Sequence, residues 1–164
     1  MFRIGIGSDT HRLVADRPLV LGGVEIESDR GAEGHSDGDA VTHALADALL
    51  GALCEADLGA HFPDSDDQWK DADSLQLLAR VVWLAHERGY QVGNADATIM
   101  LERPKLREHI DAMRDNLART LDVDVACVSV KAKTAEGLDA VGRGEAVSAQ
   151  AIVLLVAKNR GAGC

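Results

Sequence analysis

The 164-residue chain is poor in aromatic residues, in cysteine and in positive charge. Because only 3% of the residues are aromatic, a hydrophobic core must be built mainly from Val, Leu, Ile and Ala. The three cysteines are odd in number and widely spaced, which predicts neither a disulfide framework nor a cysteine-based zinc site. No apolar run approaches the ~20 residues that a transmembrane helix needs.

The net charge and the first residues indicate the compartment and the partners to expect. Lys and Arg total 17 against 27 Asp and Glu, and the net charge of −10 argues against a nucleic-acid partner. The first five residues lack the charged-then-apolar layout of a signal peptide. We therefore expect a cytoplasmic protein in a reducing compartment, with neither a membrane nor a nucleic acid as partner.

The hydrophobic pattern predicts one domain over residues 1–158, followed by a disordered tail over 159–164. The expected strands are 1–9, 92–101, 125–133 and 147–156, with a hairpin over 18–26, and the expected helices are 41–52, 74–88 and 104–121. This alternation favours an α/β (α+β) fold in which helices cover one face of a mostly four-stranded mixed sheet.

Two histidines and one aspartate form a candidate metal site. Asp9 and His11 are two apart on the first strand, so their side chains point to the same face. His43 lies in the first turn of the helix at 41–52 and shares with Asp47 a face outside the apolar stripe. A catalytic zinc ion typically has three protein ligands and one open position, which this set can provide. The alternative is a polar turn after a strand and one surface histidine.

A second group of polar residues ends another strand. Lys131 and Lys133 share one face of the strand at 125–133, and Thr134 and Glu136 follow it. Lys, Thr and Glu at a strand end can hold phosphate and a divalent ion. An ordinary edge strand with solvent-facing lysines is the alternative.

Two further patterns resemble functional motifs but are not interpreted as such. Gly5 and Gly7 follow an apolar strand, but the third glycine and the immediate helix of a dinucleotide-binding motif are missing. Trp69 and Trp83 lack a basic neighbourhood and are interpreted as packing residues.

Seven short motifs carry a family resemblance. They are GSDTH at 7–11, HSDGD at 35–39, HALADALLG at 43–51, DLG at 57–59, FPDSD at 62–66, PK at 104–105 and GRGE at 142–145. In this order and spacing, over nearly the whole chain, they resemble the 2-C-methyl-D-erythritol 2,4-cyclodiphosphate synthase family.

The resemblance implies a lyase of the non-mevalonate isoprenoid pathway. Such an enzyme converts 4-diphosphocytidyl-2-C-methyl-D-erythritol 2-phosphate to 2-C-methyl-D-erythritol 2,4-cyclodiphosphate plus CMP. The substrate's own 2-phosphate attacks, and since it is already an anion, no activated Ser or Cys is needed. Two alternatives remain: a zinc-dependent phosphoesterase that uses the same ligands, and a non-enzymatic trimeric module that binds an isoprenoid diphosphate.

The resemblance also implies the assembly and the metals. It implies a homotrimer with three sites at subunit interfaces. Zinc would be bound by Asp9, His11 and His43, and Mg²⁺ or Mn²⁺ would be held through Glu136 and the substrate phosphates.

The expected catalytic residues are His35 and Thr134, which match positions that steady the transition state in the family. The expected contacts of the methylerythritol and ribose are His35, Ser36, Asp57, Leu58, Gly59, Phe62, Pro63, Asp64, Ser65 and Asp66. Asp9, Thr10 and His11 are further expected substrate contacts. Those of the cytidine diphosphate are Leu101, Pro104, Lys105, Leu106, Lys133, Thr134, Ala135 and Glu136, with Ala140 and Arg143 near the diphosphate and the threefold channel.

The chain departs from the family pattern at three positions. Lys133 replaces a frequent Thr and should still suit phosphate, and Thr10 replaces a commoner Val. Ala140 stands where a Phe is usual, which opens space or alters the central channel where relatives bind an isoprenoid diphosphate.

Overall fold

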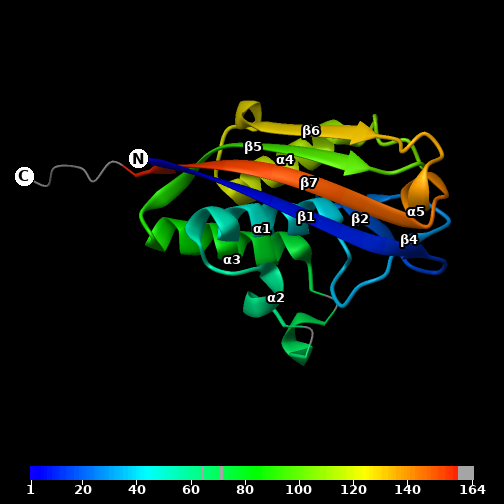
Figure 1. Ribbon diagram of the computed structural model, residues 1–164, viewed down its shortest axis with the longest axis horizontal. Helices are drawn as coiled ribbons and strands as arrows, with labels where there is room; N and C mark the ends of the chain where they lie inside the picture. The colour runs from blue at the N-terminus through cyan, green and yellow to red at the C-terminus, as the bar shows by residue number, and fades with distance from the viewer. Residues whose placement is uncertain (64, 71, 159–164) are drawn as a thin grey trace, which may run out of the picture.

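A computed structural model describes residues 1–63, 65–70 and 72–158, and it places helices on one face of a mixed sheet (Figure 1). The tail expected at 159–164 lies outside the described residues. The strands are β1 (Phe2–Val14), β2 (Leu19–Leu21), β3 (Val24–Ile26), β4 (Gly31–Ala32), β5 (Tyr90–Met100), β6 (Val128–Lys133) and β7 (Ala146–Ala157). The helices are α1 (Ala40–Leu53), α2 (Leu58–His61), α3 (Ser74–Glu87), α4 (Ile110–Leu121) and α5 (Asp139–Gly142), with 3₁₀ turns η1 (Asp67–Trp69) and η2 (Val125–Cys127).

The main sheet has five strands in the order β4-β1-β7-β5-β6. The expectation of four strands is wrong, because it did not include the short strand β4. β7 runs antiparallel to both β1 and β5, whereas β5 and β6 are parallel. β1 was expected to end at Asp9 but continues to Val14, because its ladder with β7 extends to Arg12 opposite Ala146. That extension provides the edge on which β4 pairs. β2 and β3 form the expected hairpin as a separate sheet.

The third long helix begins later than expected. α4 starts at Ile110 instead of Pro104. The preceding segment is held in an irregular path because Leu101 and Leu106 are both buried in the core. β6 likewise begins at Val128, since the Asp124 side chain accepts a hydrogen bond from the backbone of Ala126 and turns the chain into η2.

Helix α1 is buried on almost every side. Eleven of its fourteen residues are buried, so the single apolar stripe predicted from the sequence describes only part of its packing. The helix lies against β1 and β7 on one side and against α3 on the other (Figure 1). Among its residues, His43, Asp47 and Gly51 escape full burial.

Two glycines in β1 set the distance between the sheet and α1. A Cβ atom built on Gly5 would lie 1.9 Å from the carbonyl oxygen of Ala48, and one on Gly7 would lie 2.1 Å from that of Ala44. The backbone of α1 therefore rests directly on the backbone of β1. Close backbone approach is a reason for glycine inside a strand, so the Gly5 and Gly7 pair serves packing, a role that the sequence analysis did not predict.

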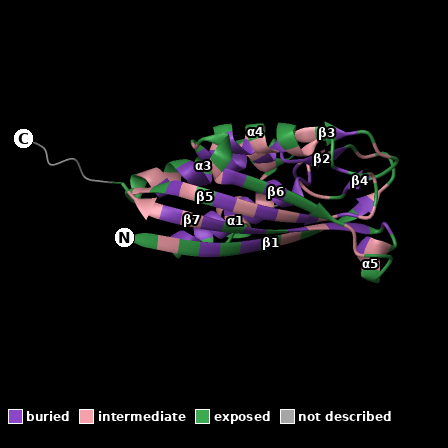
Figure 2. Ribbon diagram, turned by 90° about the horizontal axis from the view of Figure 1, so that it is seen from above, coloured by how far each residue is buried: buried purple, intermediate pink, exposed green. Residues whose placement is uncertain are grey.

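Among the described residues no long helix covers the other face of the sheet, and the one-turn helix α5 lies beside its end (Figure 2). Along β1, exposed residues alternate with buried or half-buried ones (Figure 2). Phe2, Ile4 and Ile6 are 69%, 64% and 66% exposed, and Ile152, opposite Ile6 on β7, is 49% exposed. We call these four residues the open-face patch. No helix within the described ranges has the length and hydropathy needed to cross a membrane.

We predict that Gly7→Ala destabilises the protein, because its Cβ would collide with the carbonyl of Ala44 and push α1 away from β1. Overpacking of this kind costs about 3 kcal/mol of unfolding free energy. Gly51→Ala is the matched control: its nearest neighbour is 3.8 Å away, and alanine favours a helix by about 0.5–1 kcal/mol. Urea unfolding of both variants checks the pair, and an unchanged midpoint for Gly7→Ala would contradict the close packing.

Candidate functional site

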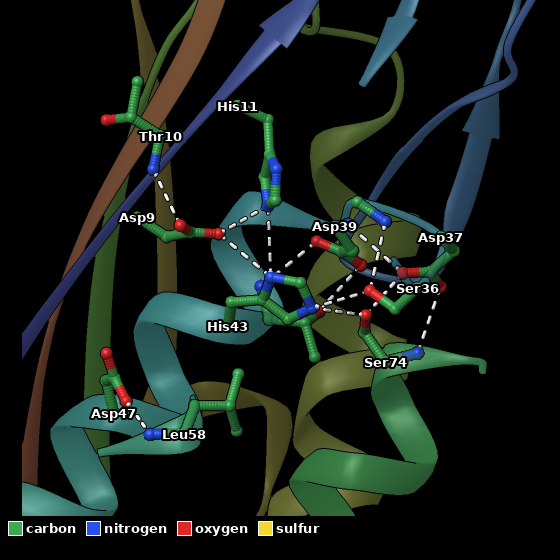
Figure 3. A network of polar contacts seen from close by, with 12 residues as sticks. Asp9, Thr10, His11, Ser36, Asp37, Asp39, His43, Asp47, Leu58 and Ser74 are labelled. Carbon is green, nitrogen blue, oxygen red and sulfur yellow. Dashed lines mark hydrogen bonds and ion pairs between the residues drawn. The ribbon is translucent and has the colours of Figure 1, made fainter. Parts of the chain in front are cut away.

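Asp9, His11 and His43 meet at one point between β1 and α1 (Figure 3). Asp9 Oδ2 lies 2.8 Å from His11 Nε2 and 2.9 Å from His43 Nδ1, and the two nitrogens are 3.2 Å apart. The three side chains are 25%, 16% and 12% exposed, so each keeps access to solvent from one side. The structure thus brings together the three ligands predicted from the sequence.

The outer nitrogen of each imidazole has its own partner. His11 Nδ1 donates to the carbonyl oxygen of Glu33 at 2.9 Å. His43 Nε2 lies 2.8 Å from the hydroxyl of Ser74 and 3.2 Å from that of Ser36. With protons kept on these outer atoms, the inner lone pairs face Asp9 Oδ2. Metal-binding histidines are commonly held in this way, and the donor set fits a divalent cation.

The electrostatics of the cluster favour positive charge beside Asp9. Burial by itself would raise the pKa of the Asp9 carboxyl, but hydrogen bonds and charge from His11 and His43 outweigh it and hold this pKa well below its usual range. Burial would lower the pKa of His11, but the bond to Asp9 and its charge raise it overall. A bound cation supplies the same positive charge without the protons.

A buried carboxylate positions the helix that carries His43. Asp39 is fully buried at the N-cap of α1 and accepts from the backbone and hydroxyl of Thr42 at 3.1 and 2.7 Å. It also accepts from the backbone of Gly22 and Gly23 at 2.9 and 2.7 Å, so it ties the β2–β3 hairpin to α1. Burial raises the pKa of Asp39, and these bonds stabilise its charged form against that effect.

A cavity of about 510 Å³ opens beside the three ligands. Its lining is Asp9, His11, Gly34, His35, Ser36, His43, Asp47, Asp57, Leu58, Gly59, Phe62, Trp69 and Leu77. Asp47 Oδ1 accepts from the backbone of Leu58 at 2.7 Å and so fixes the start of α2 to α1 (Figure 3). Within the described chain, His35 Nε2 is buried without a hydrogen-bond partner.

Trp69 was interpreted as a packing residue, but it lines this cavity. Its ring stands edge-on to Phe62 at 5.0 Å between centroids, and the guanidinium of Arg80 lies 4.9 Å from the ring centre. Leu77 of α3 is a second lining residue that the sequence analysis missed. One sequence signal could have indicated that Trp69 lines the cavity. It lies among the loops that follow α1 and belongs to no apolar periodicity that would place it in a helix or strand.

Other expected substrate contacts lie outside this cavity. Thr10 points to the opposite face of β1 and lines a separate cavity of about 320 Å³. Asp66 accepts from the backbone of Gln68 and caps η1. Pro63 and Ser65 are likewise absent from the lining of the 510 Å³ cavity. Asp64 lies outside the described residues.

The residues expected to hold the cytidine diphosphate gather in a second cavity of about 490 Å³. Its lining is Leu101, Pro104, Lys105, Leu106, Arg107, Ile110, Ala132, Lys133, Thr134 and Glu136. The Thr134 hydroxyl donates to Glu136, and Glu102 accepts from the backbone of Ala135 at 3.2 Å. The loop after β6 thus presents a lysine, a hydroxyl and a carboxylate together. Ala135 is the expected contact that does not line the cavity.

The two cavities are apart within one chain. The register aligns Asp9 with Ala149, Ile99 and Ala132 across β1, β7, β5 and β6. Three strand spacings separate β1 from β6 by roughly 14 Å. Arg143 forms a third location, where its guanidinium pairs with Glu145 at 3.0 Å beside α5. Ala140 and Arg143 line neither cavity.

Comparisons with known proteins agree over almost the full length. The sequence profile of the YgbB family matches residues 2–156. The 2-C-methyl-D-erythritol 2,4-cyclodiphosphate synthase of Salinibacter ruber is 60% identical over 149 residues, which cover 91% of this chain and 95% of that protein.

Solved structures show the same likeness. The bifunctional IspDF of Campylobacter jejuni has a TM-score of 0.90 at 39% identity, covering 94% of this chain and only 42% of that longer one. A 2C-methyl-D-erythritol-2,4-cyclodiphosphate synthase in its CDP-bound form has a TM-score of 0.87 at 42% identity, covering 94% of this chain and all of that one.

We predict that His43→Ala and Asp9→Asn each lose about one equivalent of tightly bound metal, because each removes a ligand from a three-ligand set. Thr10→Ala is the control, since its side chain lies on the other face of β1 and should leave the metal content unchanged. Elemental analysis after dialysis against a zinc salt gives the metal content, and circular dichroism checks that the fold is kept. Full occupancy in His43→Ala would refute the ligand assignment.

Proposed function

The chain belongs to the YgbB family of 2-C-methyl-D-erythritol 2,4-cyclodiphosphate synthases, and we propose how its own residues carry out the family's cyclisation. It is a lyase of isoprenoid precursor synthesis, which forms 2-C-methyl-D-erythritol 2,4-cyclodiphosphate and CMP from the cytidyl diphosphate substrate. The observation that carries the proposal is the pairing of a metal-binding triad in a polar cavity with a second cavity lined by lysines and Thr134.

The two cavities suit the two ends of the substrate. We assign the methylerythritol part to the cavity beside the triad, where His35, Ser36 and the 57–59 segment offer polar groups and Phe62 offers an apolar wall. Trp69 and Leu77 extend that wall. We assign the cytidine diphosphate to the second cavity, with the base near Leu106 and the phosphates near Lys133 and Thr134.

The chemistry asks little of the protein beyond placement and charge. The attacking 2-phosphate is anionic at neutral pH, so no side chain has to activate a nucleophile. Zinc at Asp9, His11 and His43, and Mg²⁺ or Mn²⁺ at Glu136, would supply the positive charge that offsets repulsion between the phosphates. His35 and Thr134 hold phosphate oxygens in the geometry of attack, and the cavity walls fold the substrate so that the reaction is intramolecular.

We propose that three copies of the chain form a ring. The open-face patch of Phe2, Ile4, Ile6 and Ile152 supports this, since a contiguous exposed apolar surface usually marks an interface. The separation of the two cavities within one chain gives further support. In a threefold ring each contact is head-to-tail. Such a contact can join the cavity beside the triad of one copy to the second cavity, proposed for the nucleotide, of the next copy.

Two smaller assignments complete the proposal. We propose a cytoplasmic protein, in line with its acidic composition and its scattered cysteines. We also propose that an isoprenoid diphosphate binds only weakly in the threefold channel, because Ala140 lacks the usual aromatic ring and Arg143 is already paired with Glu145.

We predict that the protein, given the cytidyl diphosphate substrate and metal ions, produces a cyclic diphosphate and CMP in phosphorus NMR spectra. His43→Ala should give neither product, whereas Trp83→Ala, an exposed position on α3 that lines neither cavity, should keep the wild-type rate. Orthophosphate as the product would point instead to a phosphoesterase, and the absence of turnover would point to a binding module.

We predict that two inactive variants restore activity when they are combined. His43→Ala and Thr134→Ala are unfolded together in equal amounts and refolded. A shared site is intact only when its metal half comes from the Thr134 variant and its nucleotide half from the His43 variant, which random assembly allows in about a quarter of sites. Recovery near that fraction supports sites between copies, and no recovery would mean that each site is built within one chain.

A further inference from the structure

Asp37 and Ser74 lie outside the cavity and interact, through the Ser74 hydroxyl, with Nε2 of His43, the ring nitrogen that faces away from Asp9. Ser74 is the first residue of α3 and is fully buried. Its hydroxyl lies 2.8 Å from His43 Nε2 and also hydrogen-bonds to Asp37 Oδ1 (Figure 3). The backbone N–H of Ser74 donates to Asp37 Oδ2 at 3.0 Å. Neither Asp37 nor Ser74 lines the cavity beside the triad.

The chemistry of Asp37, Ser74 and His43 decides which group donates each hydrogen bond between them. An ionised carboxylate only accepts hydrogen bonds, so the single proton of the Ser74 hydroxyl is donated to Asp37. The serine oxygen then faces His43 Nε2 with a lone pair. A hydrogen bond between them forms only when Nε2 carries the proton, and His43 Nδ1 is left as a lone pair directed toward Asp9 Oδ2.

Ser36 offers a second hydroxyl oxygen that can accept a hydrogen bond from the same Nε2 proton. Its oxygen lies 3.2 Å from His43 Nε2 and also accepts from the backbone of Gly38 at 3.4 Å. Two hydroxyl oxygens thus converge on one nitrogen. These two contacts fix the rotation of the imidazole, and the Ser74 contact sets its tautomer.

We propose that Asp37 and Ser74 are positioning residues for the metal site, which set the tautomer and orientation of His43 so that Nδ1 is available to the cation. This inference rests on the proposed metal role of Asp9, His11 and His43. It extends the metal site to the N-terminus of α3, an element that supplies none of the three ligands.

A purely structural role for Ser74 makes a different prediction. The same contacts stabilise the first turn of α3, and Asp73 stabilises it too by accepting from the backbone of Leu75 at 2.9 Å. Asp73 has no contact with His43 among the hydrogen bonds of the described chain. Asp73→Ala therefore weakens the helix end without disturbing the imidazole, and it is the matched control for Ser74→Ala.

The test measures zinc affinity of metal-free protein by competition with a chromogenic chelator. Ser74→Ala should raise the zinc dissociation constant about tenfold, the lower end of the range for lost outer partners of metal ligands. Ser36→Ala combined with Ser74→Ala should raise it further, because no hydroxyl then faces Nε2. Asp73→Ala should lower the thermal midpoint while leaving zinc affinity within about twofold of wild type.

A second variant and a second signal guard against a folding defect. Asp37→Asn keeps the shape of the side chain but removes the charge that draws the serine proton, so it should also weaken zinc binding. In cobalt-substituted protein, the visible absorption of Ser74→Ala should shift from that of wild type, whereas that of Asp73→Ala should not. If Ser74→Ala does not fold, Asp37→Asn decides the question.

The outcomes separate the two levels of the proposal. Wild-type zinc affinity in Ser74→Ala, or in Asp37→Asn when the first variant does not fold, would overturn the positioning role. Equal weakening by Ser74→Ala and Asp73→Ala would overturn it as well, because helix capping would then explain the loss. Failure of the wild-type protein to bind zinc would instead overturn the metal site itself.

Discussion

The direct contact between the backbones of α1 and β1 is the constraint on which the rest of the structure depends. Gly5 and Gly7 leave no side chain between the strand and the helix, so α1 lies closer to the sheet than ordinary side chains permit. The same strand continues to Asp9 and His11, and the same helix begins just before His43. A packing feature of the core therefore fixes the ligand-to-ligand distances of the site.

The charge of the protein and the charge of its substrate have the same sign. A chain with net charge −10 acts on a polyanion, and the structure shows how the acids are distributed to allow this. Asp9 faces two histidines, Asp39 is saturated with backbone and hydroxyl donors, and Asp37 is bound to the start of α3. In the proposed mechanism, acids that remain open to the cavities hold cations, and the cations hold phosphate.

The local pattern predicted the triad well. Residues two apart on a strand point to the same face, and a residue outside the apolar stripe of a helix points away from that stripe. The family resemblance likewise named most residues that line the two cavities, although Trp69 and Leu77 were missed. The errors arose where tertiary contacts override local signals. Burial of Leu106 delays α4 despite a proline that suits a helix start, and α1 is buried on nearly all sides because α3 covers its outer face. Trp69 belongs to the cavity through its contact with Phe62, and because Phe62 caps the end of α2 whereas Trp69 lies in η1, no helical or strand pattern connects them.

The exposed face of the sheet would make the stability and activity of the proposed ring depend on protein concentration. The apolar side chains of β1 and β7 on that face gain little from folding of one chain, since they stay in water until another surface covers them. In the proposed ring, part of the free energy that holds the fold together would be realised on association, and mass action would make it depend on the amount of protein present. Dilution of such a ring would remove stability and completed sites together, so the rate per chain would report how often chains meet as well as how well each is built.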